Sequence, residues 1–205
     1  MNQSLKLYWS PKSPYVRKVM ICAHELGLVN RLKLVRAVAA MLKPNPEIMV
    51  DNPLSKIPTL VREDGLVLFD SVVICEYLND LVQGDLFPDE GEAKWQALRW
   101  HALADGLIDA LILWRNERER LQPSVDLIAA FDLKVRSSLT LLEQEVDALR
   151  LSSLNIGTLN LGCALGYIDY RFDGLQWRSH APGLAQWYAT LSELNSFKVT
   201  EPVDG

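Results

Sequence analysis

Ser13 is the residue whose surroundings most clearly indicate chemistry. It precedes Pro14 and follows residues 5–9, where apolar and polar side chains alternate as in a half-buried strand. Pro14 suits the first turn of a helix, and Ser13 suits its N-cap. A hydroxyl at that point lies beside unpaired backbone N–H groups and the positive end of the helix dipole, where an anion can be held. A cap with no further role is the alternative that these residues alone leave open.

Pro58 is the second residue with a chemical consequence, because it stands at the start of an apolar, strand-like run. Proline cannot donate a ladder hydrogen bond, so at this point it marks an edge, a turn or a cis peptide. The N–H and C=O groups of Ile57 are then free to bond something other than a neighbouring strand.

The composition limits the partners of these residues. The chain has 205 residues, of which 21 are basic and 26 acidic, with a net charge of −5. It is long enough for one large domain or two small ones. An acidic chain without a basic block argues against nucleic acid as the main partner. No apolar run approaches the ~20 residues needed to cross a bilayer, and no signal region is readable, so we expect no membrane association.

The three cysteines, Cys22, Cys75 and Cys163, are far apart and lie in apolar stretches. Because no C-x-x-C pair exists, neither a zinc site nor a redox dithiol is indicated. Unpaired buried cysteines fit a reducing compartment. We therefore expect a cytoplasmic protein without a bound metal.

Strand and helix patterns alternate up to about residue 80. The expected elements are a strand at 5–9, a helix at 14–27, a strand at 32–38, a proline-broken segment at 39–53, a strand from 57, a turn at 63–65, a strand at 66–69 and a helix opened by Asp70 and Ser71. Ser71 is the expected N-cap of that last helix. This order predicts a mixed sheet with helices packed on it.

Only helical patterns follow the polar, Gly/Pro-bearing connector at residues 81–91. They cover 92–120, a stretch that restarts at Pro123 and continues to Leu149, residues 155–170 and residues 182–195. The stretch at 155–170 is apolar almost all round, as a buried central helix should be. The predicted organisation is an α/β domain at 1–80, a linker at 81–91 and an all-helical domain at 92–205.

Four segments, in this order and spacing, resemble the cytosolic glutathione transferases over essentially the whole chain. They are SPYVRKV at 13–19, NPLSKIPTL at 52–60, FDSVVICEYL at 69–78 and GCALGYIDYRF at 162–172. The resemblance is nearest to bacterial serine-type transferases and to the tau and zeta classes. It implies a thioredoxin-like first domain, an all-α second domain and a homodimer.

The resemblance also implies how glutathione, as co-substrate, would be held. Pro58 would be a cis-proline that presents the backbone of Ile57 to the cysteinyl part of the peptide. Asp70 would pair with the γ-glutamyl ammonium, and the Ser71 hydroxyl with the helix N-terminus would hold the γ-glutamyl carboxylate. Lys43 would meet the glycyl carboxylate. A surface Asp, a helix-capping Ser and a solvated Lys are the alternatives.

Ser13 would then favour the thiolate form of glutathione by donating a hydrogen bond to its sulfur. The thiolate would attack a small hydrophobic electrophile. Ser10 is a rival hydroxyl three residues earlier. The same site could serve peroxide reduction or reductive dehalogenation. The alternative outside the enzymes is a binding protein of this fold with little turnover.

Two further features bear on this interpretation. Glutaredoxin-like relatives carry Cys-Pro-Tyr-Cys where this chain has serine at 13 and valine at 16, so thiol–disulfide exchange is not expected here. The side chains that could line an acceptor pocket, or serve only as core, are Trp100, Trp114 and Tyr167. His101 and Arg115 could face the cleft or a partner subunit.

Overall fold

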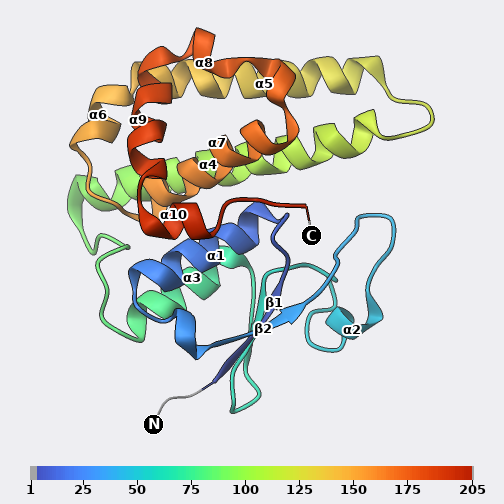
Figure 1. Cartoon of the computed structure of the whole chain (residues 1–205), viewed down its shortest axis with the longest axis vertical. Coiled ribbons are helices and arrows are strands. Elements are labelled where there is room, and N and C mark those ends of the chain that lie inside the picture. Colours follow the sequence, from blue (N-terminus) through green and yellow to red (C-terminus); the bar gives the residue numbers. More distant parts are fainter. Residues whose placement is uncertain (1–3, 205) are drawn as a thin grey trace. The chain divides into compact units, whose positions relative to one another are not determined.

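The computed structural model describes residues 4–204 and divides into two compact units (Figure 1). The sheet unit runs through Phe87 and takes in the chain from Ser196 onward, whereas the helical unit spans Pro88–Asn195. The domain limits expected at 1–80, 81–91 and 92–205 stay a prediction, because compactness alone does not define a folding domain. In the described residues, no helix has the length and apolarity needed to cross a membrane.

The sheet unit is built on four strands in the order β2-β1-β3-β4. They are β1 (Leu5–Trp9), β2 (Leu32–Arg36), β3 (Thr59–Val61) and β4 (Val67–Leu68). β1 pairs with β2 in parallel and with β3 antiparallel, and β3 pairs with β4 antiparallel. The expected mixed sheet is confirmed. Parallel strands need a crossover, and helix α1 (Pro14–Glu25) with the short 3-10 helix η1 (Val29–Arg31) supplies it.

Helices α1 and α3 (Ser71–Asp80) contact each other in the sheet unit (Figure 1). Apolar residues of α1 at helical spacing, such as Val16 and Val19, are buried. Gly27, just past α1, has a φ of 67°, the left-handed conformation that lets the chain leave a helix. The proline-broken segment is mostly irregular, with one short helix, α2 (Pro46–Met49).

Helix α10 (Asn195–Val199) ties the end of the chain to α1, because the Arg17 guanidinium donates to the Phe197 carbonyl at 3.2 Å. Its pattern is too short to be recognised in the sequence. The segment from Ser196 onward therefore belongs to the sheet unit although it follows all the helices of the other unit.

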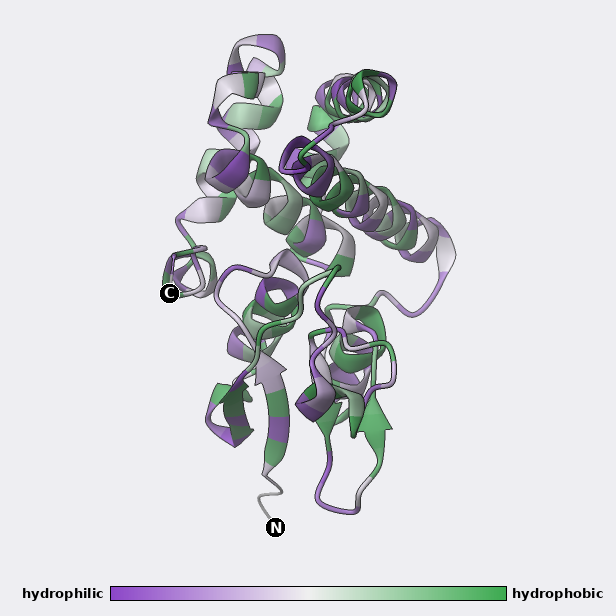
Figure 2. Cartoon of the chain, turned by 90° about the vertical axis from the view of Figure 1, so that its right-hand side faces the viewer, coloured by the Kyte–Doolittle hydropathy of each residue, from purple (hydrophilic) through white to green (hydrophobic). Residues whose placement is uncertain are grey.

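The helical unit contains six helices and a 3-10 turn within its described residues. They are α4 (Gly91–Arg118), α5 (Val125–Gln144), α6 (Val146–Leu151), α7 (Ile156–Arg171), η2 (Asp173–Leu175), α8 (Trp177–His180) and α9 (Pro182–Ser192). Hydrophobic and hydrophilic residues alternate in patches along the long helices, as expected when one face is buried (Figure 2). The stretch from Pro123 to Leu149 was expected to be one helical pattern, but the chain breaks at Glu145 between α5 and α6.

Helix α7 is the buried centre of the helical unit, and α4 packs along it. Every residue of α7 from Ile156 to Ile168 is buried. Asn155 caps the helix by accepting from the N–H groups of Gly157 and Thr158, and the Thr158 hydroxyl accepts from the Asn155 N–H at 2.9 Å. This capping box fixes where α7 begins and therefore which of its residues meet α4.

Candidate functional site

Ser13 is the N-cap of α1, as the sequence predicts. Its Oγ accepts a hydrogen bond from the Val16 N–H at 3.2 Å, and its side chain is partly exposed. The hydroxyl proton has no acceptor among the described residues. The first turn of this 12-residue helix carries no acidic side chain. A partly exposed donor therefore lies at the positive end of a helix, with no carboxylate nearby on that helix to oppose an anion.

Ser10, the rival hydroxyl, lies in the turn between β1 and α1. Only 8% of its surface is exposed, and its Oγ accepts weakly from the Lys12 N–H at 3.4 Å. Its carbonyl accepts from the Ser13 N–H at 3.3 Å, so Ser10 helps to shape the turn that presents Ser13. The difference in exposure favours Ser13 as the hydroxyl that a ligand can reach.

The Ile57–Pro58 peptide bond is cis, as the resemblance implied. Strand β3 begins only at Thr59, and within the described residues no hydrogen bond uses the backbone of Ile57. Its N–H and C=O groups are therefore open to a ligand, as Pro58 predicts.

Strand register brings three of the predicted features to one end of the sheet. Tyr8 pairs with Thr59, and Leu60 pairs with Leu68. Three segments consequently lie at the same end of neighbouring strands. They are the turn that follows β1, the Ile57–Pro58 bond that precedes β3 and the segment that follows β4. Ser13, Ile57 and Asp70 belong to these three segments.

Asp70, not Ser71, is the N-cap of α3. The Asp70 Oδ1 accepts from the Val72 N–H at 3.2 Å, whereas Ser71 is the first helical residue and is only 2% exposed. The expected cap was therefore wrong by one residue, because the longer Asp side chain reaches the N–H two positions on. Asp70 is exposed, and the Ser71 hydroxyl forms no hydrogen bond within the described residues.

Lys43 stands apart from the other predicted residues. It is exposed, and its backbone forms an isolated bridge with Ala40, to whose carbonyl its N–H donates at 3.2 Å. No described interaction joins its side chain to Ser13, Ile57, Asp70 or Ser71. The structure thus groups three segments by register and leaves Lys43 on its own loop.

A polar network that sequence reasoning missed holds the Ile57 segment in place. Asn52 is 1% exposed; its amide donates to the Thr59 hydroxyl at 2.9 Å and to the Lys56 carbonyl at 3.4 Å. The Asn52 Oδ1 accepts from the Leu54 N–H at 3.0 Å. The Asn52–Pro53 pair, a common turn signal, could have indicated this. A buried amide whose nitrogen and oxygen are both hydrogen-bonded makes a segment rigid. This network therefore positions the backbone of Ile57.

Asp51 links the same segment to β1. Its Oδ2 accepts from Lys6 Nζ at 2.7 Å and from the Tyr8 hydroxyl at 2.8 Å. The hydrogen bonds from Lys6 and then from Tyr8 lower the pKa of Asp51, and the hydrogen bond to Asp51 is the main cause that raises the pKa of Lys6. Both groups are therefore charged at neutral pH, and the pair ties the segment to the sheet.

Two of the named side chains of the helical unit act in packing. Trp100 is 2% exposed and donates from Nε1 to Glu145 Oε2 at 2.8 Å. Although burial raises the pKa of Glu145, hydrogen bonds from Arg99 and Trp100 lower it overall. His101 is 7% exposed, and its Nε2 lies 3.4 Å from Oδ2 of Asp105, one helical turn further along α4. The Trp100 contact joins α4 to the chain between α5 and α6, whereas the His101 contact lies within α4.

The other aromatic residues gather where the C-terminal parts of α4 and α7 meet. Arg115 Nη1 donates to the Tyr167 hydroxyl at 3.0 Å. Trp114 and Phe172 have ring centroids 4.9 Å apart, and the Arg118 guanidinium lies 4.2 Å from the Phe172 ring. Burial raises the pKa of Tyr167 although the nearby guanidinium of Arg115 lowers it, so the phenol is protonated at neutral pH. We call these five residues the arginine–aromatic cluster.

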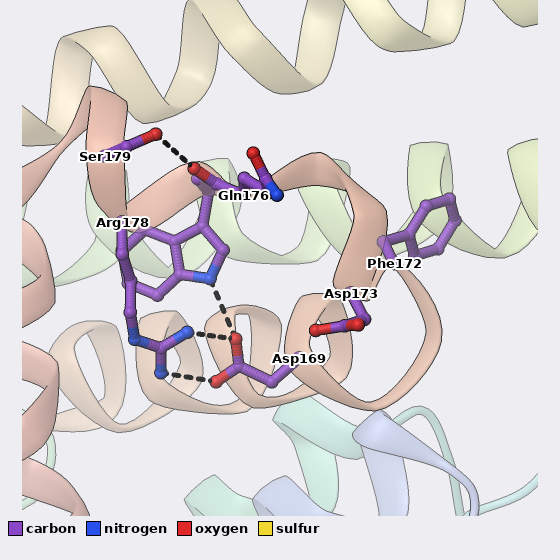
Figure 3. Close-up of a pocket in the computed structure, with 7 residues that line it drawn as sticks. Asp169, Phe172, Asp173, Gln176, Arg178 and Ser179 are labelled. Carbon is purple, nitrogen blue, oxygen red and sulfur yellow. Dashed lines mark hydrogen bonds and ion pairs between the residues drawn. The ribbon is translucent and has the colours of Figure 1, made fainter.

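A cavity of about 270 Å³ lies beside the same end of α7 (Figure 3). It is lined by Asp169, Phe172, Asp173, Gln176, Trp177, Arg178 and Ser179. Asp169 accepts two hydrogen bonds from Arg178 and one from Trp177 Nε1. Hydrogen bonding to Asp169 is the main cause that raises the pKa of Arg178. Because these groups satisfy one another, we assign them to holding α8 against α7.

No group of three or more His, Cys, Asp or Glu side chains in the described residues could hold a metal ion. The described cysteines are buried and form no disulfide with one another, and none lies in the first turn of α1.

Comparison with known proteins connects this geometry to a family. The family model of the glutathione S-transferase N-terminal domain matches residues 12–81. That range contains the residues expected to activate or bind glutathione, which are Ser13, Lys43, Ile57, Asp70 and Ser71. The GST-like protein YibF of Escherichia coli (strain K12) is 31% identical, over 97% of this chain and 98% of that protein. The chain belongs to the glutathione S-transferase family.

Solved structures of the glutathione transferase family share its fold. A family member from Pseudomonas fluorescens Pf-5, crystallised with bound glutathione, is 40% identical with a TM-score of 0.94, covering 98% of this chain and all 100% of that one. A crystal structure from the same strain with bound S-(propanoic acid)-glutathione is 39% identical with a TM-score of 0.90 and the same coverage. The thioredoxin-like unit followed by an all-helical region is thereby confirmed.

Proposed function

We propose that this glutathione transferase activates the thiol of glutathione with Ser13 and transfers it to small hydrophobic electrophiles. The observation that carries the proposal is the Ser13 hydroxyl, whose oxygen is oriented by the Val16 N–H while its proton has no acceptor in the described chain. A free thiol has a pKa near ~8.5, so little of it is thiolate at neutral pH. A hydroxyl donor at a helix N-terminus favours the thiolate.

The proposed reaction needs no proton transfer from Ser13. The thiol proton leaves to solvent, and the thiolate sulfur forms a bond to the electrophilic carbon as the leaving group departs with its electron pair. Ser13 keeps its proton and stabilises the charge on sulfur. Peroxide reduction would use the same thiolate with a different acceptor, so an acceptor panel that includes a hydroperoxide distinguishes the two activities.

Except for Lys43, the groups proposed to bind glutathione belong to the segments at the end of the sheet described above or to the start of α3. The open backbone of Ile57 pairs with the cysteinyl part of the peptide, Asp70 binds the γ-glutamyl ammonium, and Ser71 with the N-terminus of α3 binds the γ-glutamyl carboxylate. Lys43 is the proposed partner of the glycyl carboxylate. The glutathione bound to the Pseudomonas fluorescens relative supports this ligand for a chain 40% identical to it.

We also propose a cytoplasmic homodimer. The cysteines are buried and form no disulfide within the described residues, which fits a reducing compartment. Three large apolar side chains near the edge strand β4 are exposed, namely Leu66 at 49%, Phe69 at 37% and Val73 at 40%. Exposed apolar side chains this close together in the chain favour burial against a second subunit. A monomeric mass by light scattering at micromolar concentration contradicts the dimer.

The test of the proposed function is a set of hydroxyl variants assayed with a chromogenic electrophile. Ser13→Ala is expected to lower kcat/KM by about 10²-fold, the usual cost of removing one donor to a developing anion. Ser13→Thr retains the hydroxyl and is expected to retain most of the activity. Ser10→Ala is expected to stay within about threefold of the wild type, well below the tenfold that 1.4 kcal/mol would produce.

Loss of the helix cap needs its own control, because Ser13→Ala also removes a capping hydrogen bond. Ser124 caps α5 in the same way, accepting from the Leu127 N–H at 3.3 Å. Ser124→Ala therefore costs a similar ~1 kcal/mol of stability without touching the proposed site. Undiminished turnover in Ser13→Ala, or an equal loss in Ser124→Ala, would refute Ser13 as the activating group.

A further inference from the structure

Residues 38–44, which we call the Lys43 loop, have little packing to hold them in place. Ala37 and Ile48 are buried, but none of the residues between them is, although the structure describes them all. The large apolar side chains of the loop are exposed too, with Leu42 at 93%. A segment with so few buried contacts opens easily. The position of the Lys43 loop therefore depends on the hydrogen bonds at its ends.

Asn45 forms those hydrogen bonds at the end of the Lys43 loop. Its side-chain amide donates to the Val38 carbonyl at 3.2 Å, which closes the loop. Its Oδ1 accepts from the Glu47 N–H at 3.0 Å, which caps α2. Its backbone N–H donates to the Ser55 Oγ at 2.7 Å. The shortest of these three hydrogen bonds thus leads out of the loop to the segment that precedes Ile57.

Ser55 accepts this hydrogen bond from a backbone conformation that side chains disfavour. Its φ is 53°, and only 9% of its surface is exposed. A residue other than glycine persists in the left-handed region only where its surroundings hold it there. The Ser55 N–H donates to the Asn52 carbonyl at 2.9 Å, and Asn52 belongs to the network that positions Ile57. One serine therefore joins the Lys43 loop to that network.

Formation of the turn does not by itself account for Ser55. Glycine adopts a positive φ without penalty and would donate the same N–H to Asn52, so the turn needs no side chain at this position. The hydroxyl adds one thing that glycine lacks, an acceptor for the Asn45 N–H. The side chain of Ser55 is therefore explained by its bond to the Lys43 loop rather than by the turn.

An apolar contact also connects α2 with the Ile57 segment, but it does not extend to the Lys43 loop. Ile48 of α2 lies in a cluster with Tyr8 and Ala37, and Ile57 packs against that cluster. This packing anchors α2 and turns the side chain of Ile57 inward. Because residues 38–44 do not belong to the cluster, the Ser55 hydroxyl is the contact that relates their position to Ile57.

We propose that Ser55 is a positioning residue for glutathione. Its hydroxyl holds the Lys43 loop in place, so that the ammonium of Lys43 meets the glycyl carboxylate while the backbone of Ile57 meets the cysteinyl part. The inference rests on the proposed function and adds to it the residue that couples these two contacts. Ser55 acts through the backbone N–H of Asn45 and does not touch the peptide. Without the hydroxyl, ordering the loop on binding would weaken the glycyl contact alone.

The test compares glutathione with its glycyl carboxamide, which differs only in lacking the glycyl charge. The binding of both peptides to the whole protein is measured by titration calorimetry under reducing conditions. The wild type is expected to bind glutathione about tenfold more tightly, the effect of one hydrogen bond between charged groups. Ser55→Gly suits the φ of 53° but removes the hydroxyl, and it is expected to reduce this preference to about twofold.

Gln83→Gly is the matched control, because Gln83 also lies in the sheet unit with a positive φ, of 52°. Its side chain forms no hydrogen bond among the described residues. The control is expected to retain the wild-type preference. An equal loss in both glycine variants would reflect the flexibility of glycine and overturn the inference. Equal weakening of both peptides in Ser55→Gly would overturn it too, since Ser55 would then only keep its segment folded.

A double variant tests whether Ser55 acts through Lys43. Lys43→Ala is expected to abolish the preference for the glycyl carboxylate. Adding Ser55→Gly to it should weaken glutathione binding no further, because the two substitutions remove the same contact. A further loss would place the action of Ser55 on another part of the peptide and contradict the proposal.

Hydrogen exchange tests the Lys43 loop without any ligand. The Asn45 N–H is expected to exchange about tenfold faster in Ser55→Gly than in the wild type, because it loses its acceptor. An unchanged exchange rate would show that the bond does not hold the loop, and would overturn the inference.

The binding measurements separate failure of this inference from failure of the proposed function. A preference for glutathione that depends on Ser55, without turnover of any electrophile, would support the inference and refute the transferase. Conjugation that depends on Ser13, without any preference for the glycyl carboxylate, would do the reverse. Failure of the wild type to bind either peptide would overturn both.

Discussion

The two units build their candidate binding groups in different ways. In the sheet unit, Ser13, Ile57 and Asp70 are proposed to act through the backbone or through short side chains that cap a helix, and most of the contacts that position them come from residues near them in sequence. In the helical unit, the contact between Arg115 and Tyr167 joins residues 52 positions apart. Local motifs fix the first kind of site, and the crossing of two helices fixes the second.

This difference predicts where each unit is vulnerable. A site made of caps and open backbone loses function when one donor is removed, but its fold survives. A site made of long side chains on two helices depends on the packing between those helices. Substitutions in the two units should therefore separate effects on thiol activation from effects on stability and acceptor choice.

The largest expected effect on stability is at the crossing of α4 and α7. An added Cβ at Gly157 would lie 2.9 Å from the Trp100 Cβ and would also clash with the Ala97 carbonyl. Gly157→Ala is therefore expected to lower the free energy of unfolding by about 1–3 kcal/mol, measured by urea denaturation. Gly106→Ala is the control, since nothing lies within 4 Å of its Cβ position. An unchanged free energy of unfolding in Gly157→Ala would contradict the dependence on helix packing.

Asp70 allows charge and capping to be separated in the sheet unit. Asp70→Asn retains a cap for α3 but loses the negative charge proposed to meet the ammonium, so the KM for glutathione is expected to rise about tenfold. Thermal denaturation should show little change. Asp70→Ala should show the same rise in KM and an additional loss of about 1 kcal/mol of stability. A normal KM in Asp70→Asn refutes the ammonium contact.

A smaller effect is expected at Asp51, and it depends on pH. The pKa of Asp51 is lowered in the folded chain from its ordinary value of 3.8, first by the hydrogen bond from Lys6. Its contribution to stability is therefore fully present above that ordinary value and is lost as the pH falls through the lower folded value. Asp51→Asn should cost about 1 kcal/mol at neutral pH, and the difference from the wild type should vanish in acid.

Asp64→Asn is the control for this measurement, because within the described residues Asp64 interacts only with Arg62 and the Leu66 N–H in the β3–β4 turn. Its stability is expected to match the wild type at every pH. A constant difference between wild type and Asp51→Asn across the acid range would show that the charge of Asp51 is not what anchors the segment.

The sequence predicts features that depend on neighbouring residues better than features that depend on contacts between distant ones. The Ser13 cap and the turn after α1 depend on neighbouring residues and can be predicted from them. The residues around Pro58 allow an edge, a turn or a cis peptide, and the family resemblance implies the cis bond that the structure has. The cap of α3 was placed one residue late, because Asp70 and Ser71 are both good caps and only geometry decides between them. Helix periodicity did not show the break at Glu145, since the apolar spacing continues across it.

Tertiary contacts account for what the sequence could not show. Asn52 looks like an ordinary loop residue until its amide is seen bonded to Thr59 and Lys56. Trp114, Tyr167 and Arg115 were recognised as candidates, but which donors remain unpaired depends on how α4 meets α7. Nothing in the spacing of residues marks Arg118 as part of the same cluster.

The most direct test of the central claim is the ionisation of the bound thiol. The thiolate absorbance of enzyme-bound glutathione, followed as a function of pH, gives the thiol pKa with and without the Ser13 hydroxyl. The wild type and Ser13→Thr are expected to hold it at least about one unit below the free value near ~8.5, and Ser13→Ala should return it close to that value. An identical titration in Ser13→Ala and the wild type would contradict the account.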